Sequence, residues 1–215
     1  MAERKPPRRT RERILENSRV LFNRFGEPHI TTADIADEMN ISPGNLYYHF
    51  RNKDDIIGEL YLAYEASVIP LLVAPRDPPP DVEDLWFLLH VLFERMSHYR
   101  FLFRDLDEIT SRNRKLATRF TALIRRGEST VTAFCEGLVN TGQMRASKQD
   151  IAAISSNVSL VSTYWMSWQR ILGNRAESDP QANLDHAAYQ VLSLIAPFLV
   201  GDGRALIERL GADYL

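Results

Sequence analysis

Two short helical patterns separated by a tight turn, within residues 31–53, constrain the fold of this chain more than any other stretch. The first pattern opens at Thr31, whose hydroxyl can cap a helix while Asp34, three residues on, reaches back as in a capping box. The apolar residues that then share one helix face are Ile35, Ala36 and Met39. This pattern predicts a first helix with one buried side, ending near Asn40.

The second pattern begins at Ser42, a capping residue, followed by Pro43 at the first helical position, where a missing N–H costs nothing. Leu46 and Phe50, four residues apart, form the expected buried edge of this very short helix. The residues expected to point away from that edge are Asn45, Tyr47, Tyr48 and His49. Gly44 lowers helix propensity by about 1 kcal/mol, which favours a site where another surface approaches the backbone closely. Together the two patterns predict a helix-turn-helix whose second helix enters the DNA major groove by its N-terminal end.

The run ISPGNLYYHFRNK at residues 41–53, preceded by TTADIA at residues 31–36, resembles the signature of the TetR family of bacterial transcriptional regulators. The resemblance covers roughly residues 11–60. It implies a transcriptional repressor that binds a double-stranded, pseudo-palindromic DNA operator as a homodimer and is released by a small molecule. One position departs from the family pattern, because Asn45 stands where threonine is common; this bears on base preference and not on fold.

The resemblance also implies how individual residues act on DNA. Tyr47 and Tyr48 match positions that touch bases or phosphates, and the amide of Asn45 can read adenine through two hydrogen bonds. Pro43 and Gly44 would contact base edges sterically. The residues that match phosphate contacts are Thr31 or Thr32, Ser42, His49 and Lys53.

Three of these assignments have a structural alternative or a condition. Tyr48 and His49 would instead pack on the first helix of the pair if their role were only structural. Lys53 is expected to lie exposed at the start of the next helix, where backbone N–H groups and its ammonium could jointly hold a phosphate.

The charge distribution favours nucleic-acid binding by the N-terminal part, although the whole chain carries a net charge of −2. Residues 1–53 contain 10 Lys and Arg against 7 Asp and Glu, whereas the remainder contains 16 against 21. The six basic residues near the N-terminus are Arg4, Lys5, Arg8, Arg9, Arg11 and Arg13. They form either an arm that lies on phosphates or in the minor groove, or a solvated tail.

The chain is predicted to be all-α, because its long segments repeat their apolar residues with helical period and none alternates as a strand does. A first helix is expected from Arg11 to a C-terminal Gly26. Its apolar face, expected to pack behind the helix-turn-helix, is Ile14, Leu21, Phe22 and Phe25. A fourth helix is expected from Asn52, a natural cap, to about Val73, before Pro75–Asp81 breaks the helical pattern.

The predicted architecture is an N-terminal three-helix domain containing the helix-turn-helix, joined by a long helix to a C-terminal helical bundle. Residues 1–53 would form the DNA-binding domain with its basic arm, and residues 54–215 the ligand-binding and dimerisation domain. Val82–Tyr99 is apolar nearly all round, which predicts burial on more than one side. Ser147 and Asp150 form a second capping box that opens another long helix.

The resemblance places the dimer contact on the last two long helices, Ile151–Leu172 and Leu184–Leu199. A two-fold dimer would set two recognition helices about 34–36 Å apart, one turn of DNA. The alternative is a monomeric bundle that buries these faces within itself.

The resemblance also implies an effector pocket among the middle helices, and the aromatic residues there suit an apolar or aromatic ligand. The candidate ligand-binding residues are Trp86, His90, Phe93, Phe120 and Phe134; the alternative for each is ordinary core packing. His90, Glu94 and His98 lie on one helix face, but three ligands so spaced rarely converge on one ion. A solvated or ion-paired stripe is expected there, and no metal site or cofactor is predicted.

An enzyme is not expected, because no Ser-His-Asp spacing, glycine-rich phosphate loop or paired carboxylates stand out, and there is no catalytic candidate. The single Cys135 is expected to be a buried small hydrophobe. No apolar run reaches the roughly 20 residues needed to span a bilayer and no signal peptide is evident, so a cytoplasmic location without membrane partners is predicted. A second functional class is a ligand- or protein-binding helical module that has lost specific DNA binding.

Overall fold

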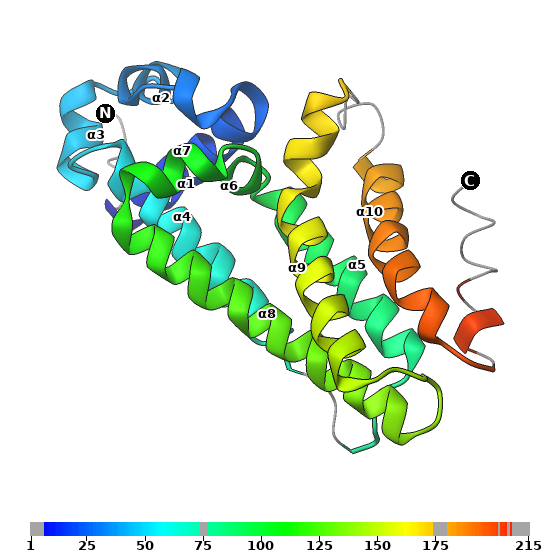
Figure 1. Ribbon diagram of the computed structural model, residues 1–215. Coiled ribbons are helices and arrows are strands. Elements are labelled where there is room, and N and C mark those ends of the chain that lie inside the picture. The colour runs from blue at the N-terminus through cyan, green and yellow to red at the C-terminus, as the bar shows by residue number, and fades with distance from the viewer. Residues whose placement is uncertain (1–6, 74–76, 174–179, 202, 206, 208–215) are drawn as a thin grey trace. The chain divides into compact units, whose positions relative to one another are not determined.

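The computed structural model describes residues 7–73, 77–173, 180–201, 203–205 and 207, and in these ranges it contains no strand (Figure 1). A single isolated β-bridge joins Met144 to Leu199. The helices are α1 (Pro7–Phe25), η1 (Glu27–His29), α2 (Thr32–Glu38), α3 (Pro43–His49), α4 (Lys53–Val68), α5 (Val82–His98), α6 (Phe101–Arg104), α7 (Leu106–Arg112), α8 (Arg114–Asn140), α9 (Lys148–Ile171), α10 (Pro180–Ile195) and η2 (Ala196–Phe198). The prediction of an all-α chain is confirmed. Within the described ranges, none of these helices combines the length and the apolar character that crossing a bilayer requires.

The chain forms two compact units. Unit 1 comprises Met1–Ala66 and Tyr99–Thr118, and unit 2 comprises Ser67–His98 and Arg119–Leu215. Unit 1 therefore contains α6 and α7 besides the first four helices, because α6 packs on α1. These compact units do not coincide with the two predicted functional domains, which meet at residue 53. The functional boundary at residue 53 stays a prediction.

The core of unit 1 is built on one face of α1. Ile14 and Phe22 are fully buried, and the Phe22 ring lies 5.2 Å from that of Phe101 in α6. The prediction that Phe25 belongs to this face is wrong, because its side chain is 49% exposed and the Arg24 guanidinium lies over its ring. Phe25 is the last helical residue, and the chain turns away from the helix at Gly26, whose φ is +96°.

α4 ends at Val68, five residues before the predicted end. Pro70 explains the difference, because a proline disfavours helical dihedrals in the residue before it and cannot donate a backbone hydrogen bond. The predicted cap at the other end is confirmed, since the Asn52 side-chain oxygen accepts a 2.8 Å hydrogen bond from the Asp55 N–H. Of the predicted break at Pro75–Asp81, residues 75 and 76 lie outside the described residues; Asp81 caps α5 through the Asp84 N–H.

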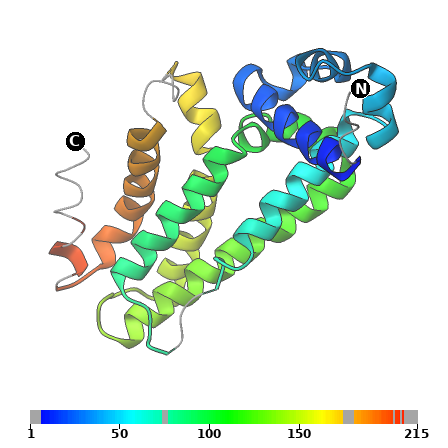
Figure 2. The same cartoon turned by 180° about the vertical axis from the view of Figure 1, so that it is seen from behind.

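In unit 2, α10 packs against both α5 and α9 (Figure 2). The capping box of Ser147 and Asp150 at the start of α9 is confirmed. Cys135 is buried as predicted, and burial, with a smaller contribution from the charge of Glu136, raises the pKa of its thiol to about 11. The prediction that the fifth helix is buried on several sides fails at Phe87, which is 63% exposed.

Candidate nucleic-acid interface

The start of α2 is fixed by the predicted capping box. The Thr31 N–H and hydroxyl each donate to the Asp34 carboxylate at 2.7 Å, and the Asp34 N–H donates back to the Thr31 hydroxyl at 3.2 Å. These hydrogen bonds lower the pKa of Asp34. Ile35 and Ala36 are fully buried, as their spacing predicts. The hydroxyl of Thr31 is therefore committed to the cap, while its neighbour Thr32 makes a different contact.

α3 begins at Ser42, whose hydroxyl accepts a 3.2 Å hydrogen bond from the Asn45 N–H, with Pro43 in the first turn. Leu46 and Phe50 are buried, so this edge of α3 faces the core of unit 1. At Gly44, an added Cβ would meet only the Ser42 hydroxyl, 4.0 Å away. The packing of the protein itself therefore does not require a glycine at this position.

The two tyrosines of α3 face outward. Tyr48 is 79% exposed and Tyr47 is 52% exposed. The Tyr47 hydroxyl lies 3.0 Å from the Thr32 hydroxyl, which ties α3 to α2, whereas the Tyr48 ring lies edge-on to the His49 ring, at 5.1 Å between centroids. The alternative in which Tyr48 packs on α2 is therefore wrong, and its exposed ring needs another explanation.

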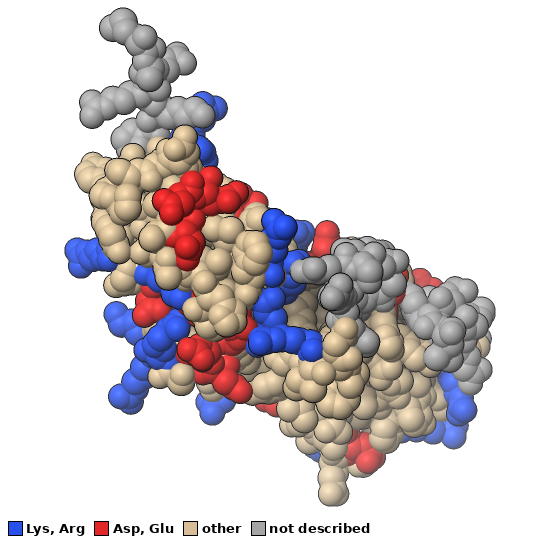
Figure 3. All heavy atoms as spheres, turned by 90° about the horizontal axis from the view of Figure 1, so that it is seen from above, with Lys and Arg blue, Asp and Glu red and all other residues tan. Residues whose placement is uncertain are grey.

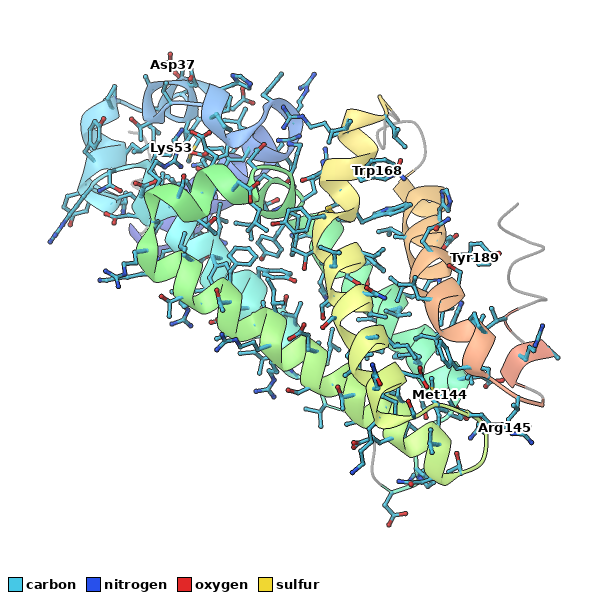
Figure 4. The ribbon with its side chains drawn as sticks, in the orientation of Figure 1. Asp37, Lys53, Met144, Arg145, Trp168 and Tyr189 are labelled. Atoms are coloured by element: carbon cyan, nitrogen blue, oxygen red, sulfur yellow. The ribbon has the colours of Figure 1, made fainter. Side chains whose placement is uncertain are left out.

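The charges beside α3 suit the approach of a polyanion. No acidic residue lies between Glu38 and Asp54. By contrast, α2 carries exposed Asp34, Asp37 and Glu38, and acidic side chains gather on one part of unit 1, with Lys and Arg side chains around it (Figure 3). Asp37 projects outward from α2 (Figure 4). Because phosphates are repelled by carboxylates, α3 offers a polyanion a less repulsive surface than the outer face of α2 does.

Part of the predicted basic arm is helical. Arg8, Arg9, Arg11 and Arg13 belong to α1, whereas Arg4 and Lys5 lie outside the described residues. Arg11 is committed within unit 1, because its guanidinium lies 2.8 Å from the Glu59 carboxylate and 4.8 Å from the centre of the Phe50 ring. Hydrogen bonding to Glu59, and its charge, outweigh partial burial and raise the pKa of Arg11.

Lys53 is not exposed at the start of α4, and that prediction is wrong. Its ammonium donates to the backbone carbonyls of Glu27 and Ile30, at 3.0 and 2.9 Å, and pairs with the Glu27 carboxylate at 2.8 Å. Its side chain is 23% exposed. Two of the three N–H donors of the ammonium are therefore used by backbone carbonyls, and its charge is paired with Glu27.

Glu27 and Arg112 have no role in the sequence-based prediction, yet they form an ion pair within unit 1. Glu27 is fully buried, and its Oε1 lies 2.9 Å from the Arg112 guanidinium of α7. Although partial burial lowers the pKa of Arg112, the Glu27 hydrogen bond and the nearby carboxylates raise it overall. A buried carboxylate needs such paired cations to remain charged. A separation of 85 residues along the chain leaves no local pattern by which to predict this contact.

The candidate effector residues lie in unit 2, on α5 and α8. Phe93, Phe120 and Phe134 are buried, which fits both ordinary core packing and the lining of an enclosed effector pocket, so their role stays a prediction. The rings of Trp86 and His90 lie 4.0 Å apart between centroids and are tilted by 40°, and the His90 Nδ1 lies 2.9 Å from the Trp86 carbonyl. Trp86 Nε1 and His90 Nε2 are buried atoms for which the described residues offer no hydrogen bond.

The stripe of His90, Glu94 and His98 does not act as one group. His90 Nε2 lies 3.3 Å from the Asp185 carboxylate of α10, close enough for an ion pair but without hydrogen-bond alignment. Glu94 and His98 are exposed. His90 is therefore directed toward α10, and the other two side chains toward solvent.

One face of α9 exposes large apolar side chains. Their spacing of three or four residues places them on one stripe along the helix, and Trp168 projects from it (Figure 4). The stripe comprises Leu160, Tyr164, Trp168 and Ile171, which are 58%, 43%, 53% and 77% exposed. A contiguous apolar stripe of this kind is typical of a protein-protein contact.

Comparisons with known proteins agree with the helix-turn-helix. Residues 14–60 match the family model of bacterial regulatory proteins of the tetR family, and residues 63–207 match that of a bacterial transcriptional repressor. A TetR-family transcriptional regulator of Marinobacter aquaeolei is 36% identical, with a TM-score of 0.84 over 95% of this chain and 98% of that one.

Two further relatives are more distant. The probable acrEF/envCD operon repressor of Escherichia coli K12 is 35% identical over 54 residues, which cover 25% of this chain and 24% of that protein. A putative transcriptional regulator of Saccharomonospora viridis, solved in complex with choline, shares the fold at 21% identity, with a TM-score of 0.68 over 90% of this chain and 99% of that one.

Unit 1 contains a helix-turn-helix whose second helix is exposed and carries no acidic residue, and unit 2 is also helical. This combination defines a class of DNA-binding transcriptional regulators. Within that class, the chain belongs to the TetR family of bacterial transcriptional regulators.

Proposed function

We propose that this protein is a homodimeric repressor that binds a pseudo-palindromic DNA operator through α3 and is released by a small molecule. The observation that carries the proposal is the surface of α3, where Asn45, Tyr47 and Tyr48 are exposed on a helix whose opposite edge is buried. A cytoplasmic location is part of the same proposal. The alternative, a module without DNA binding, leaves the exposed Tyr48 ring without a purpose.

The proposed roles on DNA separate base readers from phosphate contacts. Asn45, with Tyr47 and Tyr48, reads base edges or thymine methyl groups, and Pro43 and Gly44 approach the bases closely. The proposed phosphate contacts are Thr32, Ser42 and His49, since the N–H and hydroxyl of Thr31 are bonded to Asp34. Lys53 is treated separately below, because its ammonium is already bonded within the protein.

The proposed dimer contact is the apolar stripe of α9, together with α10. A two-fold axis through this contact would pair each stripe with its own copy, as closed dimers require. Such a dimer presents two recognition helices about 34–36 Å apart and so reads two half-sites.

The proposed effector is a small apolar or aromatic molecule that carries a hydrogen-bond acceptor. Trp86 Nε1 is a buried donor without a partner among the described residues, and a bound acceptor would satisfy it. The choline complex shows that a protein of the same fold holds a small molecule. An effector that favours the dimer unable to bind DNA by about 1–3 kcal/mol would weaken operator binding roughly 5- to 150-fold.

The test is binding of the purified protein to the DNA just upstream of its own coding region, titrated with salt and with nonspecific competitor. Binding that resists competitor and weakens steeply with salt supports a specific regulator. The same complex then serves to screen small molecules for release. Equal affinity for that DNA, for selected DNA and for competitor would contradict the proposal.

Asn45→Ala should relax the preference at one base pair of each half-site while leaving the others unchanged. The loss of a bidentate amide contact should reduce discrimination there by about 1–3 kcal/mol. Binding selection from random DNA by both proteins measures the effect position by position. An unchanged consensus would remove Asn45 from the base readers.

Gly44→Ala should weaken operator binding without lowering the stability of unit 1. An alanine Cβ fits the protein, since its closest neighbour is 4.0 Å away, and alanine favours helix by about 1 kcal/mol over glycine. If the N-terminal end of α3 enters the groove, the added methyl collides with DNA, and affinity should fall roughly 10-fold or more. Thermal unfolding and anisotropy titration separate the two effects, and undiminished affinity would mean that DNA does not approach this backbone.

A further inference from the structure

We infer that Arg112 is a positioning residue for the recognition helix, acting with Glu27 and Lys53 as a clamp that closes the base of the α2–α3 segment. Lys53 then serves this clamp and not a DNA phosphate. The inference rests on the proposed function, because it assigns a role in holding the DNA-binding surface. The three residues are called the base clamp below.

The base clamp joins the two flanks of the helix-turn-helix. Glu27 and Ile30 lie just before α2, and Lys53 is the first residue of α4, just after α3. The Lys53 ammonium bridges these flanks across 26 residues of sequence by donating to the Glu27 carbonyl, and across 23 residues by donating to the Ile30 carbonyl. The segment between them is therefore a closed loop whose two ends are tied by one side chain.

Arg112 reaches both flanks from α7. Its Nη2 lies 2.9 Å from Glu27 Oε1, and its Nε lies 3.3 Å from the Asp54 carboxylate, which follows Lys53 in α4. A third contact, 3.7 Å from Nη1 to Glu108, orients the guanidinium along α7 itself. Contacts in three directions suit the planar fork of a guanidinium, which lysine does not provide.

The burial of Glu27 makes this arrangement cooperative. Its carboxylate is fully buried, and one oxygen, Oε1, accepts a hydrogen bond from Arg112 and forms an ion pair with the Lys53 ammonium at 2.8 Å. The Glu27 N–H is fixed as well, because it donates to the Asp105 carboxylate between α6 and α7 at 2.9 Å. Removing one cation leaves the buried charge with a single counterion, so the remaining contact must rearrange. Each member of the base clamp thus depends on the others.

The donors of Lys53 argue against a phosphate role. Two of its three N–H groups donate to the Glu27 and Ile30 carbonyls, and the ammonium also pairs with the buried Glu27 carboxylate, so an incoming phosphate would compete with this ion pair. A phosphate contact and a positioning residue differ in one measurable quantity, the salt dependence of DNA binding. Removing a phosphate contact lowers the slope of log affinity against log salt by about 0.9, whereas removing a positioning residue leaves it unchanged.

The first experiment measures amide hydrogen exchange in the full-length protein for Arg112→Gln, Arg112→Lys, Glu27→Gln and the Glu27→Gln/Arg112→Gln double variant. Arg114→Gln is the matched control, because it removes the same charge from an exposed side chain two residues away. The amides of α2 and α3 should exchange roughly 10- to 100-fold faster in Arg112→Gln, the effect of losing a charged hydrogen bond. The α9 amides should not change.

Coupling within the base clamp decides the interpretation. The double variant should exchange no faster in α2 and α3 than the more affected single variant, and Arg112→Lys should restore part of the protection. If Arg112→Gln behaved like Arg114→Gln, or if the two single effects multiplied, Arg112 would not position the recognition helix. This readout needs no DNA, so it stands apart from the proposed function.

The second experiment measures operator affinity over a range of salt concentrations for Lys53→Gln and Arg112→Gln. Both should bind about 10-fold more weakly or worse, with the salt slope of the wild-type protein. A slope smaller by about 0.9 in Lys53→Gln would make Lys53 a phosphate contact and overturn its assignment to the base clamp. If the wild-type protein bound no DNA specifically while the exchange effects were present, the proposed function would fail and the base clamp would remain.

Discussion

Trp168→Glu should convert the protein from a dimer to a monomer and remove most of its affinity for an operator with two half-sites. Trp168 is 53% exposed in the middle of the apolar stripe of α9. A carboxylate there would be buried without a partner in the proposed two-fold contact. The loss of a central aromatic anchor is expected to cost about 2–4 kcal/mol of association energy, which is roughly 30- to 1,000-fold in the dimer dissociation constant.

Sedimentation velocity at several concentrations measures the effect on assembly, and titration of DNA carrying one or two half-sites measures its consequence. Ala122→Glu is the control, since it adds the same charge at an exposed alanine of α8 in the same unit. The control should remain dimeric and should bind the two half-sites together. A dimeric Trp168→Glu protein would show that the stripe of α9 is not the dimer contact.

Phe22→Ala should destabilise unit 1 by about 3–5 kcal/mol, the usual cost of removing a fully buried phenylalanine. The ring is completely buried and packs on Phe101, so its loss opens a cavity between α1 and α6. Hydrogen exchange of the amides in α1–α4 measures the local free energy of opening. The exchange of α9 and α10 should change much less, because these helices belong to unit 2.

Phe25→Ala provides the matched comparison on the same helix. Its ring is 49% exposed and contacts the Arg24 guanidinium, so its removal should cost no more than about 1 kcal/mol. Similar effects from the two substitutions would contradict the described core of unit 1.

The helix starts were predictable from sequence because their chemistry is local. Thr31 with Asp34, Ser42, and Ser147 with Asp150 each cap a helix through bonds that span three residues, and the structure confirms all of them. The early end of α4 also had a local signal in Pro70, which the apolar period of the surrounding residues obscured.

Exposure was less predictable, because helical period shows which residues share a face but not what covers that face. Phe25 and Trp168 both fit the apolar period of their helices, yet both are about half exposed. Phe25 is exposed because it is the last residue of α1, where the core of unit 1 ends. For Trp168, the proposed dimer contact would supply the cover that a single chain lacks.

The base clamp lay beyond sequence reasoning for a different reason. Glu27 appears in the sequence as an isolated acid in a turn, and Arg112 as one of several arginines near the start of α8. Only the packing of α6 against α1, and of α7 against α6, brings them together, 85 residues apart. The same cluster changes the expected role of Lys53. Its place in the family pattern predicts a phosphate contact, whereas its ammonium donates to backbone carbonyls within the protein.

The proposed repressor must recognise specific DNA as a two-fold dimer. Selection of binding sites from random DNA is the most direct test of this property. The account predicts a pseudo-palindromic consensus whose half-sites are centred about 10–10.5 base pairs apart or at a multiple of that distance. Recovery of no consensus, or of a single half-site without its inverted copy, would contradict it.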